Sequence, residues 1–476
     1  MATLRFLLNG ERVEEREAPP GMTVLDWLRG VRRLTGTKEG CAEGDCGACT
    51  IAVARPGQGH LRYQAVNSCL MLLPQLDGAS VVTVEGLAGK DGALHPVQQA
   101  LVDTDGTQCG FCTPGFAMAM FALQQGGEAP SDAAIHEALA GNLCRCTGYR
   151  PIVEACRRIA GRGGAPAADA AAVEADLAKL SLDNEYSRDG ERFFAPRSVD
   201  VLIKLLGYFP NATLLGGGTD LGLLASKERQ RFPVAVSLAG IEELHEVWIG
   251  PDSVRLGGAV TYSEALPHLD MCFPEFGVLV RRIGSRQIRN LGTLAGNLAT
   301  ASPIGDTLPC LIALDASVRL RSAKVREMKV AEFITGYRTT ALGKGEFIES
   351  ISIPRLKAVQ RFFAYKLSKR FDQDISAVIA AFRIEIEGGA ARSLRAAYGG
   401  MASTPKRAVN VEAALTGRPW TPDALKDIDA LLAQDFDPMD DQRAGALHRI
   451  RAAANLLRRL QLESSGGAAP VRLEAL

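Results

Sequence analysis

The pattern of apolar positions predicts an α+β region at the amino end of the chain. Residues 4–15 read as an apolar strand, an Asn9-Gly10 turn and a second strand, which is a strong hairpin signal. Thr23 and Asp26 have the spacing of a capping box, so a short helix is expected to follow. Further β runs, such as TIAVA and SVVTVEGL, complete a small unit that mixes strands and one helix.

Further along the chain the apolar spacing changes several times. Residues 96–160 contain four stretches with helical periodicity, which predict a compact helical bundle. Residues 161–175 are rich in Ala and Gly and poor in bulky apolar side chains, so they predict an exposed linker. Short β runs, glycine turns and helices alternate over residues 190–355. After residue 360, three strands precede two helices, and residues 466–476 read as a frayed tail.

Composition narrows the possible functions. The 476 residues are 47% apolar, yet no stretch approaches the ~20 apolar residues of a membrane helix. Lys plus Arg and Asp plus Glu balance at 54 each, so no nucleic-acid partner is expected. The amino end lacks the pattern of a secretion signal, which predicts a cytoplasmic protein. Eleven cysteines in such a chain favour metal ligation over disulfides, and the six histidines form no ligand pair.

The first cysteine set lies in the sequence CAEGDCGAC. Its spacing is Cys41-x4-Cys46-x2-Cys49, which is typical of a plant-type 2Fe–2S cluster, and Cys69 is the candidate fourth ligand. The intervening glycines allow the loop to wrap tightly around a small inorganic core. A zinc knuckle or a disulfide loop is the alternative, although zinc sites usually pair their cysteines in two separate hooks.

A second cysteine set lies in the predicted helical region. Cys109 and Cys112 form one pair, Cys144 and Cys146 form another, and both pairs come just before predicted helices. Helix N-termini carry a partial positive charge that suits anionic thiolates. Four thiolates with one C-x2-C hook also fit zinc, and a redox C-x-x-C is a third possibility. The other three cysteines, Cys156, Cys272 and Cys310, are expected to be packing residues.

Both cysteine sets resemble the iron–sulfur part of the molybdenum hydroxylases, the family of xanthine dehydrogenase and aldehyde oxidase. The stretches GCAEGDCGAC, QCGFCTPG and NLCRCTGYRPI carry this resemblance across roughly the first 160 residues. It implies that the eight cysteines ligate two 2Fe–2S clusters. One cluster would lie in a β-grasp ferredoxin domain and the other in a four-helix domain. The resemblance also places Gln108 near a molybdopterin cofactor.

Two glycine-rich stretches follow in the middle of the chain. Residues 212–224 read as a strand, three glycines, Thr-Asp and a helix. Consecutive glycine N–H groups can cradle a phosphate, although a plain tight turn explains the run equally well. Residues 283–306 are too polar and too rich in glycine for an ordinary core. Together the two stretches resemble the FAD domain of the same family, in which two glycine-rich loops grip the pyrophosphate.

That resemblance implies a set of FAD contacts in this chain. Ile283 stands where animal members of the family have an aromatic residue, and residues 368–376 correspond to a charged segment beside the flavin. The implied contacts are Gly216, Gly217, Gly218, Thr219, Asp220, Leu221, Ile283, Thr293, Asn297, Asp306, Tyr337, Ile348 and Lys366.

The expected architecture is an α+β multidomain chain. Its FAD domain is expected to be of the vanillyl-alcohol-oxidase-like type, with a C-terminal α/β flavoprotein subdomain. The predicted segments are a plant-type 2Fe–2S domain (1–78), a helical 2Fe–2S domain (79–160), a linker (161–187), an FAD-binding domain (188–357), a C-terminal flavoprotein domain (358–465) and the tail.

The resemblance further implies an electron-transfer role, with no catalytic residue on this chain. About 110 residues remain after the clusters and the flavin region, too few for a molybdopterin-binding region. The chain therefore resembles the small subunit of a bacterial xanthine dehydrogenase. The expected partner is a molybdopterin-binding large subunit, in a heterotetramer of two small and two large chains with NAD as the acceptor. The alternatives are another molybdenum hydroxylase, acting on an aldehyde or N-heterocycle, and a non-enzymatic zinc-binding scaffold.

Overall fold

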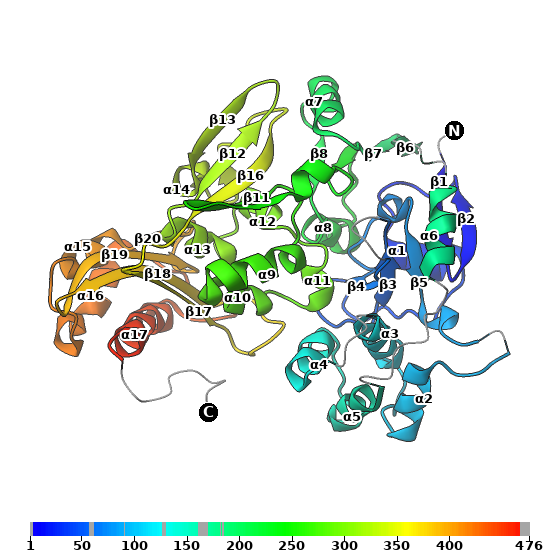
Figure 1. The fold of residues 1–476 in the computed structure, drawn as a ribbon, viewed down its shortest axis with the longest axis horizontal. Helices are drawn as coiled ribbons and strands as arrows, with labels where there is room; N and C mark the ends of the chain where they lie inside the picture. Colours follow the sequence, from blue (N-terminus) through cyan, green and yellow to red (C-terminus); the bar gives the residue numbers. More distant parts are fainter. Residues whose placement is uncertain are drawn as a thin grey trace. The chain divides into compact units, whose positions relative to one another are not determined.

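The computed structural model describes residues 3–56, 61–89, 91–125, 130–159, 170–180, 182 and 185–466 (Figure 1). The chain divides into two compact units, which are described separately. The first unit contains Met1–Glu242 and Gly284–Gly292, and the second contains Glu243–Ile283 and Thr293–Leu476. The short segment Gly284–Gly292 thus belongs to the first unit, while the chain on either side of it belongs to the second.

The first unit begins with a five-stranded sheet in the order β2-β1-β5-β3-β4 (Figure 1). The predicted hairpin is present, and Asn9 and Gly10 both have the positive φ that a two-residue turn of this kind requires. The Thr23 side chain accepts a hydrogen bond from the Asp26 N–H, as the capping pattern predicted. The elements are β1 (Leu4–Leu8), β2 (Glu11–Glu15), α1 (Val24–Asp26), a π-helical turn (Trp27–Val31), β3 (Thr50–Ala54), β4 (Gln64–Asn67), β5 (Ser80–Val82), and 3-10 turns at Leu73–Leu76 and Val84–Gly86.

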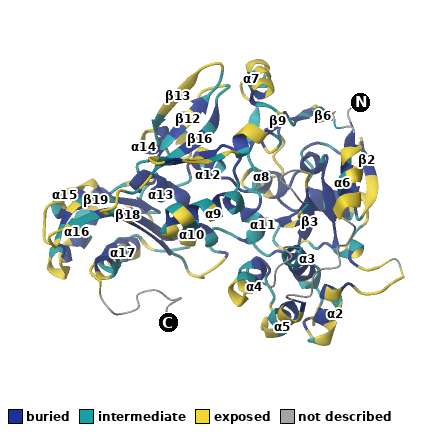
Figure 2. Ribbon diagram, in the orientation of Figure 1, coloured by how far each residue is buried: buried dark blue, intermediate teal, exposed yellow. Residues whose placement is uncertain are grey.

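Four helices follow, as their apolar periodicity predicted. The central helix α3 is buried from Gly115 to Ala122 and packs on β3 of the sheet (Figure 2). A helix that is apolar on all sides is expected in such a central position, because every face must be covered. The helices are α2 (Pro96–Asp103), α3 (Thr113–Gln124), α4 (Asp132–Leu139) and α5 (Arg150–Ile159).

The predicted linker is partly helical. Helix α6 (Ala170–Ala178) lies within it, and its Val173 and Leu177 are buried against Leu7 of β1. The expectation of an exposed linker over residues 161–175 is therefore wrong for the helical part. Alanine has the highest helix propensity, and two apolar residues four positions apart form one helix face. The remainder of this stretch, residues 161–169, lies outside the described residues.

The last part of the first unit is a four-stranded sheet in the order β6-β7-β9-β8, in which β7, β9 and β8 run parallel. The three glycines lie between strand β8 and helix α8, as the sequence predicted. The elements are β6 (Glu185–Arg188), β7 (Glu191–Phe194), α7 (Val199–Tyr208), β8 (Thr213–Leu215), α8 (Leu221–Glu228), β9 (Val234–Ser237) and, from the inserted segment, α11 (Arg286–Arg289).

The second unit contains two larger sheets. An antiparallel sheet has the order β10-β11-β16-β12-β13, and a second sheet has the order β17-β18-β19-β20. The strands are β10 (Val247–Ile249), β11 (Ser253–Gly257), β12 (Ser317–Arg321), β13 (Val325–Lys329), β14 (Ile334–Gly336), β15 (Thr339–Thr340), β16 (Phe347–Pro354), β17 (Gln360–Leu367), β18 (Val378–Glu387), β19 (Ala390–Gly399) and β20 (Lys406–Arg407).

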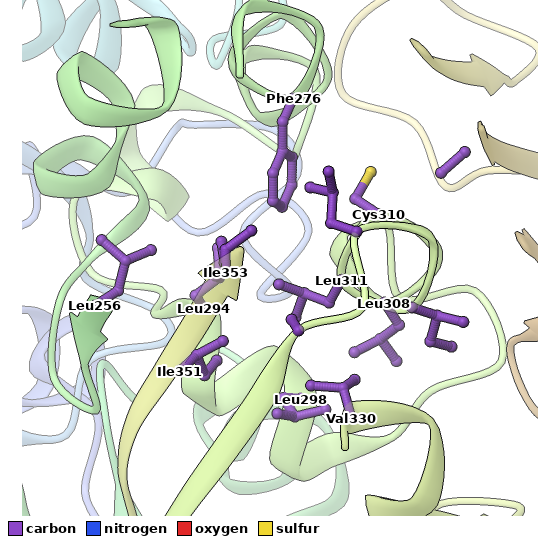
Figure 3. Packing of buried hydrophobic residues seen from close by; sticks show 14 of the residues in the cluster. Leu256, Phe276, Leu294, Leu298, Leu308, Cys310, Leu311, Val330, Ile351 and Ile353 are labelled. Carbon is purple, nitrogen blue, oxygen red and sulfur yellow. The ribbon is translucent and has the colours of Figure 1, made fainter. Parts of the chain in front are cut away.

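Helix α13 is the centre of the core in the second unit. All seven of its residues are buried, and Leu308, Cys310 and Leu311 pack with Ile351 and other side chains of the core (Figure 3). The helices of this unit are α9 (Tyr262–Cys272), α10 (Pro274–Arg281), α12 (Leu294–Thr300), α13 (Thr307–Ala313), α14 (Val330–Phe333), α15 (Val409–Leu415), α16 (Ile428–Asp435) and α17 (Ala446–Ser464), with 3-10 turns at Glu242–His245 and Pro422–Leu425.

In the described part of the chain, no helix is both long enough and apolar enough to cross a bilayer. Most of the predicted tail, from residue 467 onward, lies outside the described residues.

Candidate functional site

The first four cysteines are arranged as two pairs. Backbone N–H groups of Cys41 and Cys46 each donate to the other residue's sulfur at 3.3 Å. The Cys49 and Cys69 sulfurs lie 3.3 Å apart, and both side chains are buried. Gly44 and Gly47 have positive φ within this loop, which lets the backbone fold its N–H groups toward the sulfurs.

The second four cysteines are also paired, across the ends of two helices. The Cys109 and Cys146 sulfurs are 3.5 Å apart, and Cys112 hydrogen-bonds Cys144. Helix α3 begins directly after Cys112. Cys109 and Cys146 are exposed, so this set opens to solvent in the isolated chain, in contrast to the buried Cys49 and Cys69 of the first set.

This pairing fits a dinuclear cluster, in which each iron takes two thiolates. Among the described residues, no three His, Cys, Asp or Glu side chains converge as ligands of one metal ion. Protein N–H groups near the sulfurs, such as Glu43 N–H at 3.4 Å from Cys41, are the contacts that tune such a cluster. The donor set therefore fits 2Fe–2S clusters, which would be held by the two sets of four cysteines.

The thiols differ in acidity. The hydrogen bond with the Cys46 thiol lowers the pKa of Cys41 below the usual range. Burial raises the pKa of Cys144, but hydrogen bonds from Thr147 outweigh it and bring the pKa to about 7. Burial raises the pKa of Cys112 to about 12. Each set thus holds at least one thiol that ionises more readily than an ordinary cysteine.

The two cysteine loops touch through their backbones. The Leu143 N–H, next to Cys144, donates to the Cys46 carbonyl oxygen at 2.9 Å. This hydrogen bond therefore joins Cys46 of the first set to the residue that directly precedes Cys144 of the second set. Sequence spacing alone could not reveal this contact, because the two residues lie almost a hundred positions apart.

The glycine loop lies in the first unit and is closed by backbone contacts. A Cβ on Gly217 would lie 1.6 Å from the Leu291 carbonyl oxygen, so only glycine fits there. Gly218 has a φ of +80°, and its carbonyl oxygen accepts a hydrogen bond from Gly222 N–H at the start of α8. Thr219 and Asp220 complete the turn, and Leu221 begins the helix. The structure therefore confirms a strand, a tight turn and a helix.

Helix α8 also contacts the first cysteine loop. The Ser226 hydroxyl donates to the Ala42 carbonyl oxygen at 2.7 Å, and Gly222 leaves no room for a side chain beside the Leu70 backbone. The Gln75 side chain donates to the Gly217 carbonyl oxygen at 3.3 Å. The glycine loop and the first cysteine set thus lie in one packed region of the first unit.

The other implied FAD contacts lie in the second unit. Asp306 precedes the buried helix α13, and its carboxylate accepts from Lys366 Nζ at 2.7 Å and from the Ser376 hydroxyl at 2.7 Å. The Lys366 side chain is only 2% exposed. Asp306 and Lys366 therefore form a buried ion pair in the second unit, where the low polarity of the surroundings strengthens their electrostatic interaction.

The remaining implied contacts have different surroundings. Thr293 caps helix α12, and Asn297 in that helix accepts a hydrogen bond from Thr307. Ile348 is buried in strand β16, and Ile283 is half-buried against the core. Tyr337 is 64% exposed in the turn between β14 and β15, where its carbonyl oxygen accepts a hydrogen bond from Thr339.

A cavity of about 280 Å³ lies beside Lys366 in the second unit. The Arg282 guanidinium stacks on the Phe371 ring at 4.4 Å and donates to the Phe371 and Lys366 carbonyl oxygens. These contacts tie the segment after β17 to the end of helix α10. The family resemblance pointed to this segment, residues 368–376, but not to Arg282 as a residue that contacts it.

Models of known domain families match almost the whole chain. The FAD binding domain in molybdopterin dehydrogenase matches residues 186–356, and the CO dehydrogenase flavoprotein C-terminal domain matches residues 363–464. The 2Fe-2S iron-sulfur cluster binding domain matches residues 6–73, and a second 2Fe-2S binding domain matches residues 83–157. The domain set fits the molybdenum hydroxylase family.

Several curated proteins are similar to this chain in sequence. The xanthine dehydrogenase of Emericella nidulans is 33% identical over 91% of this chain and 36% of its own length. The xanthine dehydrogenase/oxidase of Gallus gallus is 31% identical over 91% of this chain and 38% of its own. The chain thus spans little more than a third of the length of these curated relatives.

Solved structures of carbon monoxide dehydrogenases share the fold of a little over half of this chain. A chain of carbon monoxide dehydrogenase from Hydrogenophaga pseudoflava has a TM-score of 0.54 and 25% identity, covering 56% of this chain and 94% of that one. A chain of carbon monoxide dehydrogenase from Oligotropha carboxidovorans has a TM-score of 0.53 and 26% identity, with the same coverage. The matches to the four domain families show that the chain carries two 2Fe–2S domains, an FAD-binding domain and a C-terminal flavoprotein domain.

Proposed function

We propose that this chain is the electron-transfer component of a xanthine dehydrogenase, equivalent to the small subunit of a bacterial enzyme. It would take electrons from a molybdenum centre on a partner chain and deliver them, by way of two 2Fe–2S clusters and FAD, to NAD. The clusters supply one-electron transfer, and FAD supplies the exchange between single electrons and hydride. The substrates would be hypoxanthine and xanthine, oxidised to urate on the partner.

The observation that carries this proposal is the contact between the two paired cysteine sets. The backbone hydrogen bond from Leu143 to Cys46 brings the loops together, so the cysteines could hold two clusters within short range. Four cysteines in each set would hold one cluster: Cys41, Cys46, Cys49 and Cys69 in the first, and Cys109, Cys112, Cys144 and Cys146 in the second.

The exposure of the second cysteine set supports a place where the partner chain would bind. Cys109 and Cys146 are exposed, and Phe111 and Tyr149 beside them are 48% and 41% exposed. Exposed aromatic side chains are enriched where proteins bind one another. This face would receive a molybdopterin-binding chain, with Gln108 near its cofactor. The resemblance to the molybdenum hydroxylases further suggests an assembly of two such chains and two large chains.

The FAD end of the relay is supported by the packing of the first cysteine set. The buried side chains of Cys49 and Cys69 form one cluster with Leu70, against which Leu223 of α8 packs. Residues Gly216–Leu221 would bind the FAD pyrophosphate, and in the second unit Asp306 and Lys366 would be polar contacts. Ile283, Thr293, Asn297, Tyr337 and Ile348 complete the proposed set of flavin contacts.

The experiment that tests this function uses xanthine and a molybdenum partner. Purified chain alone should show no bleaching of its visible spectrum with xanthine, and bleaching should begin when the partner is added. Urate formed from xanthine by this chain without molybdenum would contradict the proposal. Aldehydes and N-heterocycles, assayed in the same way, distinguish a xanthine dehydrogenase from other molybdenum hydroxylases.

A further inference from the structure

Three buried polar side chains from distant parts of the chain meet in the first unit. Thr50, Asn142 and Gln287 are each no more than 2% exposed. Gln287 Nε2 donates to the Asn142 Oδ1 at 2.9 Å and to the Thr50 Oγ1 at 3.2 Å. Asn142 Nδ2 in turn donates to the Gly47 carbonyl oxygen at 2.9 Å. One glutamine side chain therefore bonds both cysteine loops.

Glycines let the backbones close around this network. A Cβ on Gly47 would lie 2.1 Å from the Gly141 carbonyl oxygen, and a Cβ on Gly115 would lie 2.3 Å from the Gly47 carbonyl oxygen. A Cβ on Gly141 would lie 2.1 Å from Gln287 Oε1. Such close contacts fix the spacing of the segments, because a packed interior does not deform continuously.

Helix α11, which carries Gln287, is fastened on both sides. Arg289 is 2% exposed and pairs with Glu137 of α4 at 2.8 Å. The Asn290 side chain donates to the Ala65 carbonyl oxygen of β4 at 2.9 Å. Ile288 packs with the buried cluster that contains Cys69. The helix thus contacts both the four-helix domain and the first sheet.

We propose that Gln287 is a positioning residue that sets the spacing of the two cysteine loops, and with it the electronic coupling of the two clusters. The proposal rests on the proposed function, since it requires a cluster at each loop. Thr50 adjoins Cys49, and Asn142 lies two residues before Cys144, so the amide acts directly beside both ligand sets. A short segment from the flavin-binding region would therefore tune transfer between clusters that it does not itself ligate.

The test compares Gln287→Leu with the wild-type chain. Two reduced clusters that lie close together split each other's EPR signals, and this splitting falls steeply with distance. In dithionite-reduced wild-type chain, we expect two cluster signals with splitting. In Gln287→Leu, we expect both signals and unchanged iron content, with a smaller splitting. A variant with both clusters and unchanged splitting would overturn the proposal.

A matched control separates the effect of losing Gln287 in particular from the effect of losing any buried side-chain amide. Gln461 in α17 is 5% exposed, and its Nε2 donates to the Trp420 carbonyl oxygen and the Ser465 hydroxyl. Gln461→Leu removes a comparable buried amide in the second unit and should keep the splitting. Loss of the splitting in this control would overturn the specific role of Gln287.

If Gln287→Leu fails to assemble its clusters, a second pair of variants tests whether the network sets the spacing of the two cysteine loops. Thr50→Val removes the hydroxyl that accepts from Gln287 and Asn142 and donates to the Gly47 carbonyl oxygen, while Thr50→Ser retains it. We expect the splitting to be smaller in the first variant and unchanged in the second. Equal splitting in both, or two unsplit cluster signals in the wild-type chain, would overturn the proposal. A wild-type chain that holds a single cluster would instead contradict the proposed function on which it rests.

Discussion

Gly217→Ala tests the glycine loop most sharply, because the structure leaves no room for one methyl group. The new Cβ would lie 1.6 Å from the Leu291 carbonyl oxygen, whereas real Cβ atoms essentially never approach within 3.0 Å. The loop must therefore shift, and overpacking of this kind costs about 1–3 kcal/mol. If this whole cost falls on FAD binding, the affinity of the chain for FAD should fall roughly 5- to 150-fold.

The assay is the FAD-to-iron ratio of the purified chain after gel filtration. Iron should stay at the wild-type level, because the atoms nearest to the new Cβ belong to Leu291 and Gly292 and to none of the eight cysteines. Gly207→Ala is the matched control, since its Cβ meets nothing within 4 Å in helix α7 and alanine should stabilise the helix by about 0.5–1 kcal/mol. A Gly217→Ala chain that binds FAD as tightly as the wild-type chain would refute the reasoning.

Two further predictions concern the cysteines and the buried ion pair. Cys112→Ser should remove one of the two EPR signals of the reduced chain, whereas Cys156→Ser in the same domain should keep both signals. Loss of both signals in a folded Cys112→Ser chain would contradict the assignment of two independent clusters. Lys366→Met should destabilise the second unit by about 3–5 kcal/mol in thermal unfolding, because Asp306 loses its buried partner. Lys426→Met, in an exposed pair, should cost less than about 1 kcal/mol, and equal losses would contradict this reading.

The local elements were predictable because their signals are short-range. The Asn9-Gly10 hairpin, the Thr23 cap and the four helices after residue 96 each depend on residues within one or two turns of one another. The linker prediction failed at α6, where burial of Val173 and Leu177 against β1 outweighed the linker-like composition. The segment boundaries and the individual ligand residues stay predictions.

The candidate site was only partly predictable for a related reason. Cysteine spacing indicated two metal sets but left zinc open, and the pairing of the sulfurs in space favours a dinuclear cluster. The network around Gln287 joins residues 50, 142 and 287, and no local pattern marks them as neighbours. The phosphate role of Gly217 stays a prediction, and the close approach of the Leu291 backbone to this glycine could not be read from the sequence.

An anaerobic titration with NADH tests the central claim, that this chain alone contains a connected relay of FAD and two clusters. FAD takes two electrons and each 2Fe–2S cluster takes one, so full bleaching of the visible spectrum should require about two equivalents of NADH per chain. The flavin and both clusters should be reduced without any partner present. Bleaching that stops at about one equivalent, with the clusters still oxidised, would contradict the account.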